Sequence, residues 1–214
     1  MKYPLSAQLR EGTRKVHREV ENTPFVRSFF EGRLSKEVYR EFLVQLFHIY
    51  TAMEDHHERH SQHEVFGKLY FPELLRKEAL LQDLKYYHGN NTWEDKKPMK
   101  STQTYVQRIS DLSENWVEGL VAHHYTRYLG DLSGGQQLAL VIAKSFKLPS
   151  SEGIAFYNFP DIPDYSKFKK DYRALLDVLL VDESSSGKIV DEANRAFELN
   201  KGIFEAMEEV AMKE

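Results

Sequence analysis

The chain contains no cysteine among its 214 residues. Disulfide bonds, thiolate metal sites, iron–sulfur ligation and cysteine nucleophiles are therefore excluded, and any metal must be bound by His, Tyr, Met or carboxylate side chains. Long apolar runs are also missing: the longest covers residues 138–143, far below the roughly 20 residues that cross a bilayer. Neither end shows a signal-peptide or anchor pattern. We expect no membrane anchor and a cytoplasmic or other soluble compartment.

Positive charge is not in excess, because 29 Lys and Arg residues are opposed by 33 Asp and Glu residues. Nucleic-acid-binding domains usually carry a basic surface, so we expect no nucleic-acid partner. The composition, with 41% hydrophobic and 29% charged residues, is typical of a globular protein.

Apolar residues recur at helical spacing in the long stretches between the seven prolines. No sustained alternation of apolar and polar residues indicates a strand. We predict an all-α fold of seven to nine helices in a single compact domain over residues 1–214. The expected helices cover residues 6–23, a stretch that begins near residue 35, and residues 73–88, 101–112, 115–147, 166–180 and 188–212.

The most unusual segment is residues 123–136, which has three glycines within six positions although helix-forming residues flank it. Each glycine inside a helix costs about 1 kcal/mol relative to alanine, so composition favours a loop between two helices. The alternative is one continuous helix that gives up stability so that a flat ligand can approach its backbone. Gly130 and Gly134, four residues apart, would then lie on one helix face.

Residues 132–136 spell LSGGQ, which resembles the signature motif of ABC-transporter ATPases. Such an ATPase also needs a phosphate-binding loop of the form G-x-x-x-x-G-K-[ST]. Neither Gly-Lys pair, at 67–68 or at 187–188, has the upstream glycine or the following Ser or Thr. The sequence therefore excludes this ATPase class.

Four of the nine histidines gather in residues 56–63. Glu54 and His57 also match half of the paired Glu-x-x-His pattern that builds di-iron sites in helical bundles. No other histidine has a glutamate three residues before it. We interpret the stretch as a solvated helix end and expect most of the nine histidines to lie on the surface.

The chain resembles the haem oxygenase family from about Leu5 to Glu208. The resemblance implies a helical fold in which haem is sandwiched between a proximal and a distal helix. It implies haem b as both substrate and cofactor, cleaved with O2 to biliverdin, carbon monoxide and ferrous iron. Electrons would come from an external donor such as a ferredoxin or a flavoprotein reductase. Eight blocks in the same order carry the resemblance: Val16 with His17, Glu21 with Asn22, residues 47–50, 70–72, 123–136, 148–151 and 167–169, and Ala196 and Phe197 with Asn200.

A lone histidine on a helix is, by itself, more often structural than a metal ligand. The resemblance places His17 at the family's proximal haem ligand and so makes it the expected metal site. A neutral imidazole binds iron through one ring nitrogen while the other donates to an acceptor. Glu21, four residues later, is on the same helix face and can accept that hydrogen bond, directly or through water.

On the distal side, the resemblance places Gly130 and Gly134 against the haem face. Asp131 would hold ordered water for proton delivery without binding iron itself. Composition alone gives Asp131 a simpler role as a cap at a helix end. Three further polar residues resemble the rest of that hydrogen-bond network: Tyr50, Arg127 and Asn200.

The two haem propionates need local positive charge even on an acidic protein. Lys169 and Arg173 are spaced i, i+4, and Arg10 lies seven residues before His17. With Tyr125, these residues fall where the family places its propionate contacts, although an ordinary solvated basic face would show the same pattern. Arg10 departs from the lysine of animal relatives. Three aromatic residues are expected in the pocket wall, where core packing would explain them equally well: Phe29, Phe197 and Phe204.

Two other classes of protein remain open. A haem-binding carrier or storage protein would share the pocket but would not require Asp131 or the glycine-rich segment. A helical di-iron or thiamin-degrading enzyme on a similar bundle is disfavoured by the missing second Glu-x-x-His pair and by the absence of cysteine.

Overall fold

More than half of the residues of helix α4 (Lys36–Arg59) are buried in the computed structural model, which describes residues 4–89, 93–149 and 152–213. Its buried residues lie on several faces of the helix rather than on one stripe, as expected for a core helix. Ser35 caps its start, since its Oγ accepts a hydrogen bond from the Val38 amide at 3.1 Å.

Helices are the only regular elements of the described residues, which confirms the all-α prediction. The expected number of seven to nine helices is too low, because the described residues form ten α-helices and four 3₁₀ turns. The other α-helices are α1 (Leu5–Gly12), α2 (Arg14–Glu21), α3 (Pro24–Phe30), α5 (Lys77–His88), α6 (Lys100–Asn115), α7 (Leu120–Asp131), α8 (Gly134–Phe146), α9 (Tyr165–Asp177) and α10 (Glu183–Ala211). The 3₁₀ turns are η1 (Phe66–Leu69), η2 (Pro72–Leu74), η3 (Val117–Gly119) and η4 (Ala155–Tyr157).

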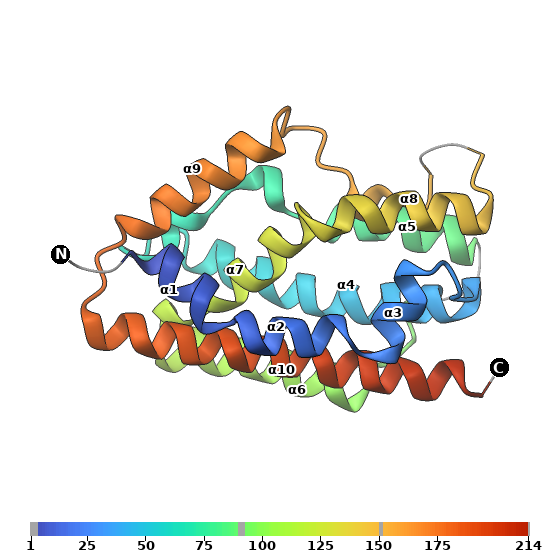
Figure 1. The fold of residues 1–214 in the computed structure, drawn as a ribbon, viewed down its shortest axis with the longest axis horizontal. Coiled ribbons are helices and arrows are strands. Elements are labelled where there is room, and N and C mark those ends of the chain that lie inside the picture. Colours follow the sequence, from blue (N-terminus) through green and yellow to red (C-terminus); the bar gives the residue numbers. More distant parts are fainter. Residues whose placement is uncertain (1–3, 90–92, 150–151, 214) are drawn as a thin grey trace.

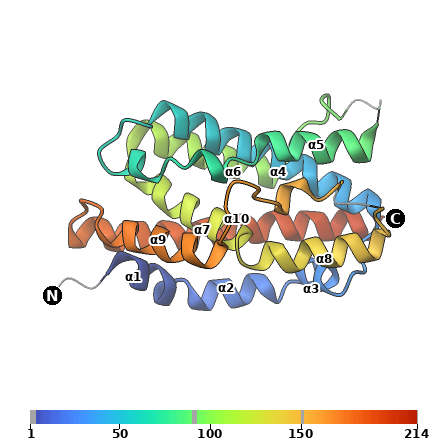
Figure 2. The same ribbon diagram turned by 90° about the horizontal axis from the view of Figure 1, so that it is seen from above.

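The longest helix, α10, runs along the long axis of the molecule and joins two groups of helices (Figure 1). It packs against α1, α2 and α3 on one side and against α4, α6 and α7 on the other. Figure 2 shows α4, α5 and α6 along one edge of the molecule and α1, α2 and α3 along the opposite edge. Among the described residues, no helix is long and apolar enough to cross a membrane.

The single helix expected over residues 6–23 is wrong, because α1 and α2 are separated at Thr13. The amide and the Oγ1 hydroxyl of Thr13 both donate to the Leu9 carbonyl, at 3.0 and 2.7 Å. Beside this break α1 lies close to α10: a Cβ atom at Gly12 would be 2.4 Å from Val190 Cγ1. The close contact at Gly12 and the break at Thr13 set the direction in which α2 leaves α1.

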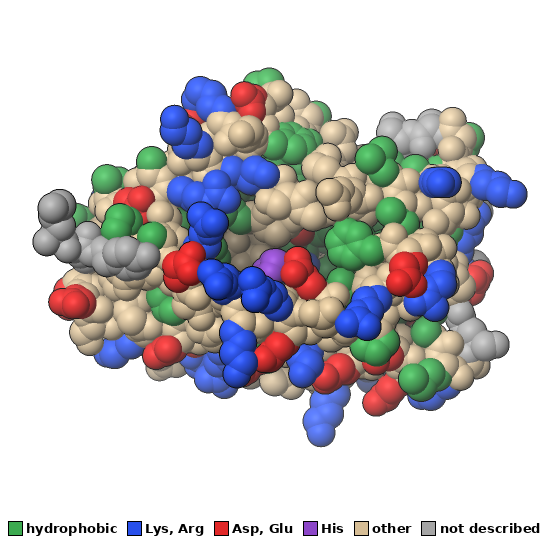
Figure 3. Space-filling model, viewed as in Figure 1, with side chains coloured by type: hydrophobic (Ala, Val, Ile, Leu, Met, Phe, Trp, Pro, Cys, Tyr) green, Lys and Arg blue, Asp and Glu red, His purple; other side chains and the backbone are tan. Residues whose placement is uncertain are grey.

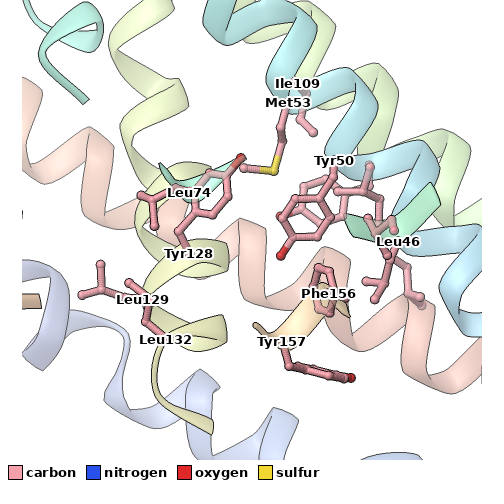
Figure 4. Packing of buried hydrophobic residues seen from close by; sticks show 14 of the residues in the cluster. Leu46, Tyr50, Met53, Leu74, Ile109, Tyr128, Leu129, Leu132, Phe156 and Tyr157 are labelled. Atoms are coloured by element: carbon pink, nitrogen blue, oxygen red, sulfur yellow. The ribbon is translucent and has the colours of Figure 1, made fainter. Parts of the chain in front are cut away.

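The main hydrophobic core contains buried residues from every described α-helix except α2. In one part of it, Tyr50 and Met53 of α4 face Tyr128 of α7 (Figure 4). A second, smaller cluster consists of Val16 and Val20 of α2 with Phe197 of α10. The buried side chains of α2 therefore pack on α10 and are not part of the main core. A cavity lies between α2 and the α7–α8 segment, as described below.

Candidate active site

Helix α2 places His17 at the border of this cavity, with about half of the side chain exposed. The Nδ1 atom of its ring is 3.4 Å from Oε2 of Glu21. The ring of Phe197 meets the His17 ring edge-on, with 5.2 Å between the ring centroids. A carboxylate at one nitrogen and an aromatic ring at the other side therefore orient the imidazole, and Nε2 is left for a ligand.

The opposite wall is formed where α7 ends and α8 begins. The expectation of a loop applies only to Leu132 and Ser133, which form a turn, and the alternative of one continuous helix is wrong. Gly130 lies inside α7, and Gly134 is the first residue of α8. A Cβ atom at either glycine would meet no atom within 4 Å. Side chains here would project into the cavity, so the glycines leave room for a flat ligand.

The cavity has mainly apolar walls with a few polar groups that converge on it, as is common in cofactor sites. Figure 3 shows the opening as a hollow with a histidine at its edge and Lys and Arg side chains nearby. Eight of the residues predicted from the sequence border this cavity: His17, Glu21, Phe29, Arg127, Gly130, Asp131, Gly134 and Phe204.

A hydrogen-bond network joins the other predicted polar residues to Asp131. The Tyr50 hydroxyl donates to Asp131 Oδ2, and Arg127 Nε donates to the Tyr50 hydroxyl at 3.1 Å. Arg127 also donates to Asn200 Oδ1 at 2.5 Å. In turn, Asn200 Nδ2 donates to the Ala196 carbonyl at 3.0 Å. Residues from α4, α7 and α10 thus fix the position of one carboxylate at the cavity.

Burial is the largest single influence on the pKa values of Asp131 and Arg127. Burial raises the pKa of the Asp131 carboxyl, and Arg127 opposes that rise. For Arg127, burial acts to lower the pKa, but Tyr50 and Asp131 outweigh it and raise the pKa. The site therefore holds a permanently charged guanidinium beside a carboxyl group that takes up a proton more readily than an exposed aspartate does.

None of the four residues expected to contact propionates is among the described residues that border the cavity. Lys169 Nζ donates to the Leu132 carbonyl and to Ser133 Oγ, both at 3.2 Å. Burial raises the pKa of Tyr125, and the positive charges of Arg173 and Arg10 oppose that rise. These groups form a basic rim: Arg10, Tyr125, Lys169 and Arg173.

The interpretation of residues 56–63 as a solvated helix end is wrong, as is the expectation that most histidines lie on the surface. His56 and His57 are buried, and so are His88, His123 and His124. The His57 ring stacks on Phe66 with 4.4 Å between centroids, and burial lowers its pKa to about 3. The described residues contain no group of three metal-binding side chains. His57 is therefore a neutral core residue.

Two cavity residues had no signal in the sequence. Phe156 and Tyr157 of η4 border the cavity, and Tyr157 lies next to Gly135. They follow a loop without helical or strand periodicity, so no sequence pattern indicates that they border the cavity. Conversely, Phe197 was expected in the wall but touches the His17 ring instead.

The fold and the site together define an all-helical protein with a cavity between a histidine and a glycine backbone. Comparison with known proteins agrees. The family model described as "Heme oxygenase" matches residues 3–206. A curated relative from Nostoc, "Heme oxygenase 1", is 45% identical over 95% of this chain and 86% of its own length.

Solved structures give the same result. The heme oxygenase of Leptospira interrogans has a TM-score of 0.91 and 46% identity, covering 94% of this chain and 98% of its own. Heme oxygenase-1 from Synechocystis in complex with heme has a TM-score of 0.94 and 42% identity, covering 99% and 95%. The chain belongs to the heme oxygenase family and is a haem-degrading mono-oxygenase.

Proposed function

We propose that this oxygenase holds haem in the cavity between α2 and the α7–α8 segment, where His17 would bind the iron. Nε2 would bind the iron while Nδ1 donates to Glu21, which lies 3.4 Å away. The fit on the other side rests on Gly130 and Gly134, where a Cβ atom would enter open space. The observation that carries the proposal is this pairing of an oriented imidazole with a bare glycine backbone across one cavity.

When bound, haem supplies the iron that activates O2 and the porphyrin ring that is cleaved to biliverdin, carbon monoxide and ferrous iron. The chain contributes a group that holds and moves a proton at the Asp131 carboxyl. Oδ2 of Asp131 accepts from Tyr50, so Oδ1 can hold water toward the cavity. Arg127, anchored on Asn200, keeps Tyr50 in place. A positioned acid of this kind typically contributes about 10²–10⁴ in rate.

The basic rim would bind the two haem propionates and orient the ring. Lys169 already donates to the turn between α7 and α8, and the positive charges of Arg10 and Arg173 act on Tyr125. The external electron donor, such as a ferredoxin or a flavoprotein reductase, would approach the same edge, where the positive charge favours an acidic partner.

The direct experiment is to add haem and a chemical reductant under air and to follow the Soret absorbance and biliverdin formation. A haem oxygenase converts the Soret band to biliverdin absorbance with release of one carbon monoxide per haem. A carrier protein would bind haem and keep the Soret band, which would contradict the proposal. Trapping the released iron with a chelator gives an independent readout of ring opening.

A further inference from the structure

The short turn η4 brings two aromatic side chains to the distal end of the cavity. The ring of Phe156 meets the ring of Tyr50 edge-on, with 5.2 Å between centroids, and Figure 4 shows the two rings next to each other. Tyr157 packs against α8, since a Cβ atom at Gly135 would lie 3.1 Å from Tyr157 Cδ1. The turn therefore packs against the Tyr50 ring through Phe156 and forms the part of the cavity wall next to Gly135.

Asp83 of α5 holds the amide groups of this turn. Its Oδ1 accepts from the Ala155 amide and its Oδ2 from the Phe156 amide, each at 2.8 Å. The side chain is fully buried. Buried amide groups need acceptors, and one carboxylate supplies both.

The carbonyl groups of the same segment are bound from two other positions. Arg76, which precedes α5, donates through one terminal nitrogen to the Asn158 carbonyl at 2.6 Å and to the Phe156 carbonyl at 3.4 Å. Gln136 of α8 donates through Nε2 to the Tyr157 carbonyl at 2.6 Å. Three side chains from outside the segment therefore bind five of its backbone groups.

Burying the ionised Asp83 carboxylate in this arrangement costs free energy. Burial raises the pKa of Asp83 to about 6, and the two amide hydrogen bonds only partly oppose the rise. Buried ionised groups are often replaced by apolar residues with a gain in stability. A buried carboxylate that binds a three-residue turn is therefore better explained by the geometry it imposes than by the stability it adds.

We propose that Asp83 is a positioning residue for turnover: together with Arg76 it fixes η4, which holds Tyr50 toward Asp131 and sets the distal wall of the cavity. The inference rests on the proposed function of that cavity. If the turn shifts, proton delivery at Asp131 slows, and the substrate ring can be attacked at more than one edge.

The test uses Asp83→Asn, which keeps the shape but offers a single acceptor oxygen, so one of the two amides faces an NH2 group. We expect kcat to fall about tenfold or more, because small misplacement near a reacting centre is costly, and the mixture of biliverdin isomers to broaden. Haem affinity should stay close to wild type. The matched control is Asp177→Asn, whose carboxylate accepts from the Ser6 amide and hydroxyl at 2.8 and 3.0 Å. It should keep the wild-type kcat and isomer pattern.

A second measurement separates positioning from a merely structural role. If Asp83 acts through η4, its substitution should change kcat and isomer pattern much less in a Phe156→Leu background than in the wild type. A purely structural role would lower the melting temperature and leave kcat per folded, haem-bound molecule unchanged. Should Asp83→Asn not fold, Gln136→Leu, which removes one carbonyl partner of the turn, is expected to shift the same two readouts.

Unchanged kcat and isomer pattern in folded Asp83→Asn, or in Gln136→Leu when only that variant folds, would overturn the inference. This failure differs from failure of the proposed function. In that case wild type and Asp177→Asn would also form no biliverdin.

Discussion

The hydroxyl of Tyr50 donates a hydrogen bond to Asp131 across 81 positions of sequence, from the central helix α4 to the last residue of α7. A carboxylate at the C-terminal end of a helix is disfavoured by the helix dipole. The Asp131 side chain is bound by a tyrosine rather than by a backbone amide at a helix start, so the simpler role of a helix cap does not describe it. The contact therefore supports a role in the cavity.

The distal glycines give a prediction in which stability and activity move in opposite directions. Gly130→Ala should raise the free energy of unfolding of the haem-free protein by up to about 1 kcal/mol, because the new methyl group meets no atom. The same methyl group enters the cavity, so haem turnover should fall. Gly202→Ala in α10, where the nearest atom is 4.0 Å away, should stabilise without loss of turnover. Equal turnover in both variants would show that Gly130 does not face the substrate.

His17→Ala should abolish biliverdin formation and change the spectrum of bound haem, because the variant loses the axial ligand. Added imidazole should partly restore the spectrum. Absorption spectroscopy during haem titration measures both effects. The control is His60→Ala, since His60 bonds to Ser113 far from the cavity in sequence and in fold. A His17→Ala variant with the wild-type spectrum and activity would rule out this ligand.

The basic rim should orient haem without taking part in the chemistry. Reversing both charges, Lys169→Glu with Arg173→Glu, should weaken haem binding or change the mixture of biliverdin isomers. Lys85→Glu, on the exposed side of α5, should change neither. The measurements are haem affinity and chromatography of the products. Wild-type affinity with an unchanged isomer mixture in the double variant would remove these residues from the haem site.

Glu54 gives a prediction for pH. Burial raises its pKa from 4.5 to about 7, although amide hydrogen bonds from Arg76 and Lys77 oppose the rise. A raised carboxyl pKa means that ionisation opposes folding, so the contribution of Glu54 to stability is largest below pH 4.5 and is lost as pH rises through 7. Relative to Glu54→Gln, the wild type should therefore lose up to about 3 kcal/mol of unfolding free energy between pH 5 and pH 8. Urea unfolding at both pH values measures this, and a constant difference would contradict it.

The sequence predicted the helical class and eight of the residues that border the cavity. Periodicity located α4 and α6 well, because their apolar positions repeat over many turns. It placed the start of α10 at residue 188, whereas the helix begins at Glu183 and includes the serines that would be expected in a loop. It missed the break at Thr13, where a hydroxyl bond to Leu9 and a close contact at Gly12 decide the geometry. These are tertiary effects, so no local pattern reports them.

Sequence patterns also could not predict which polar groups are buried near the site. In the sequence, Arg76 and Asp83 look like ordinary polar residues just before and within a helix, yet both are buried against η4. His57 lies in a run of charged residues, which predicts an exposed side chain, but the ring of Phe66 stacks on it. In each case a segment distant in sequence provides the burial.

The most direct measurement is the biliverdin yield of Asp131→Ala, taken together with its melting temperature and haem affinity. We predict that Asp131→Ala binds haem and melts like the wild type. Its biliverdin formation should be reduced by about 10²–10⁴, which is the contribution of a positioned proton donor. Asp131→Asn should retain part of the activity, because its amide can still hold water. Normal biliverdin yield from a haem-bound Asp131→Ala protein that has lost about 1 kcal/mol of stability would contradict the account and leave Asp131 a structural residue.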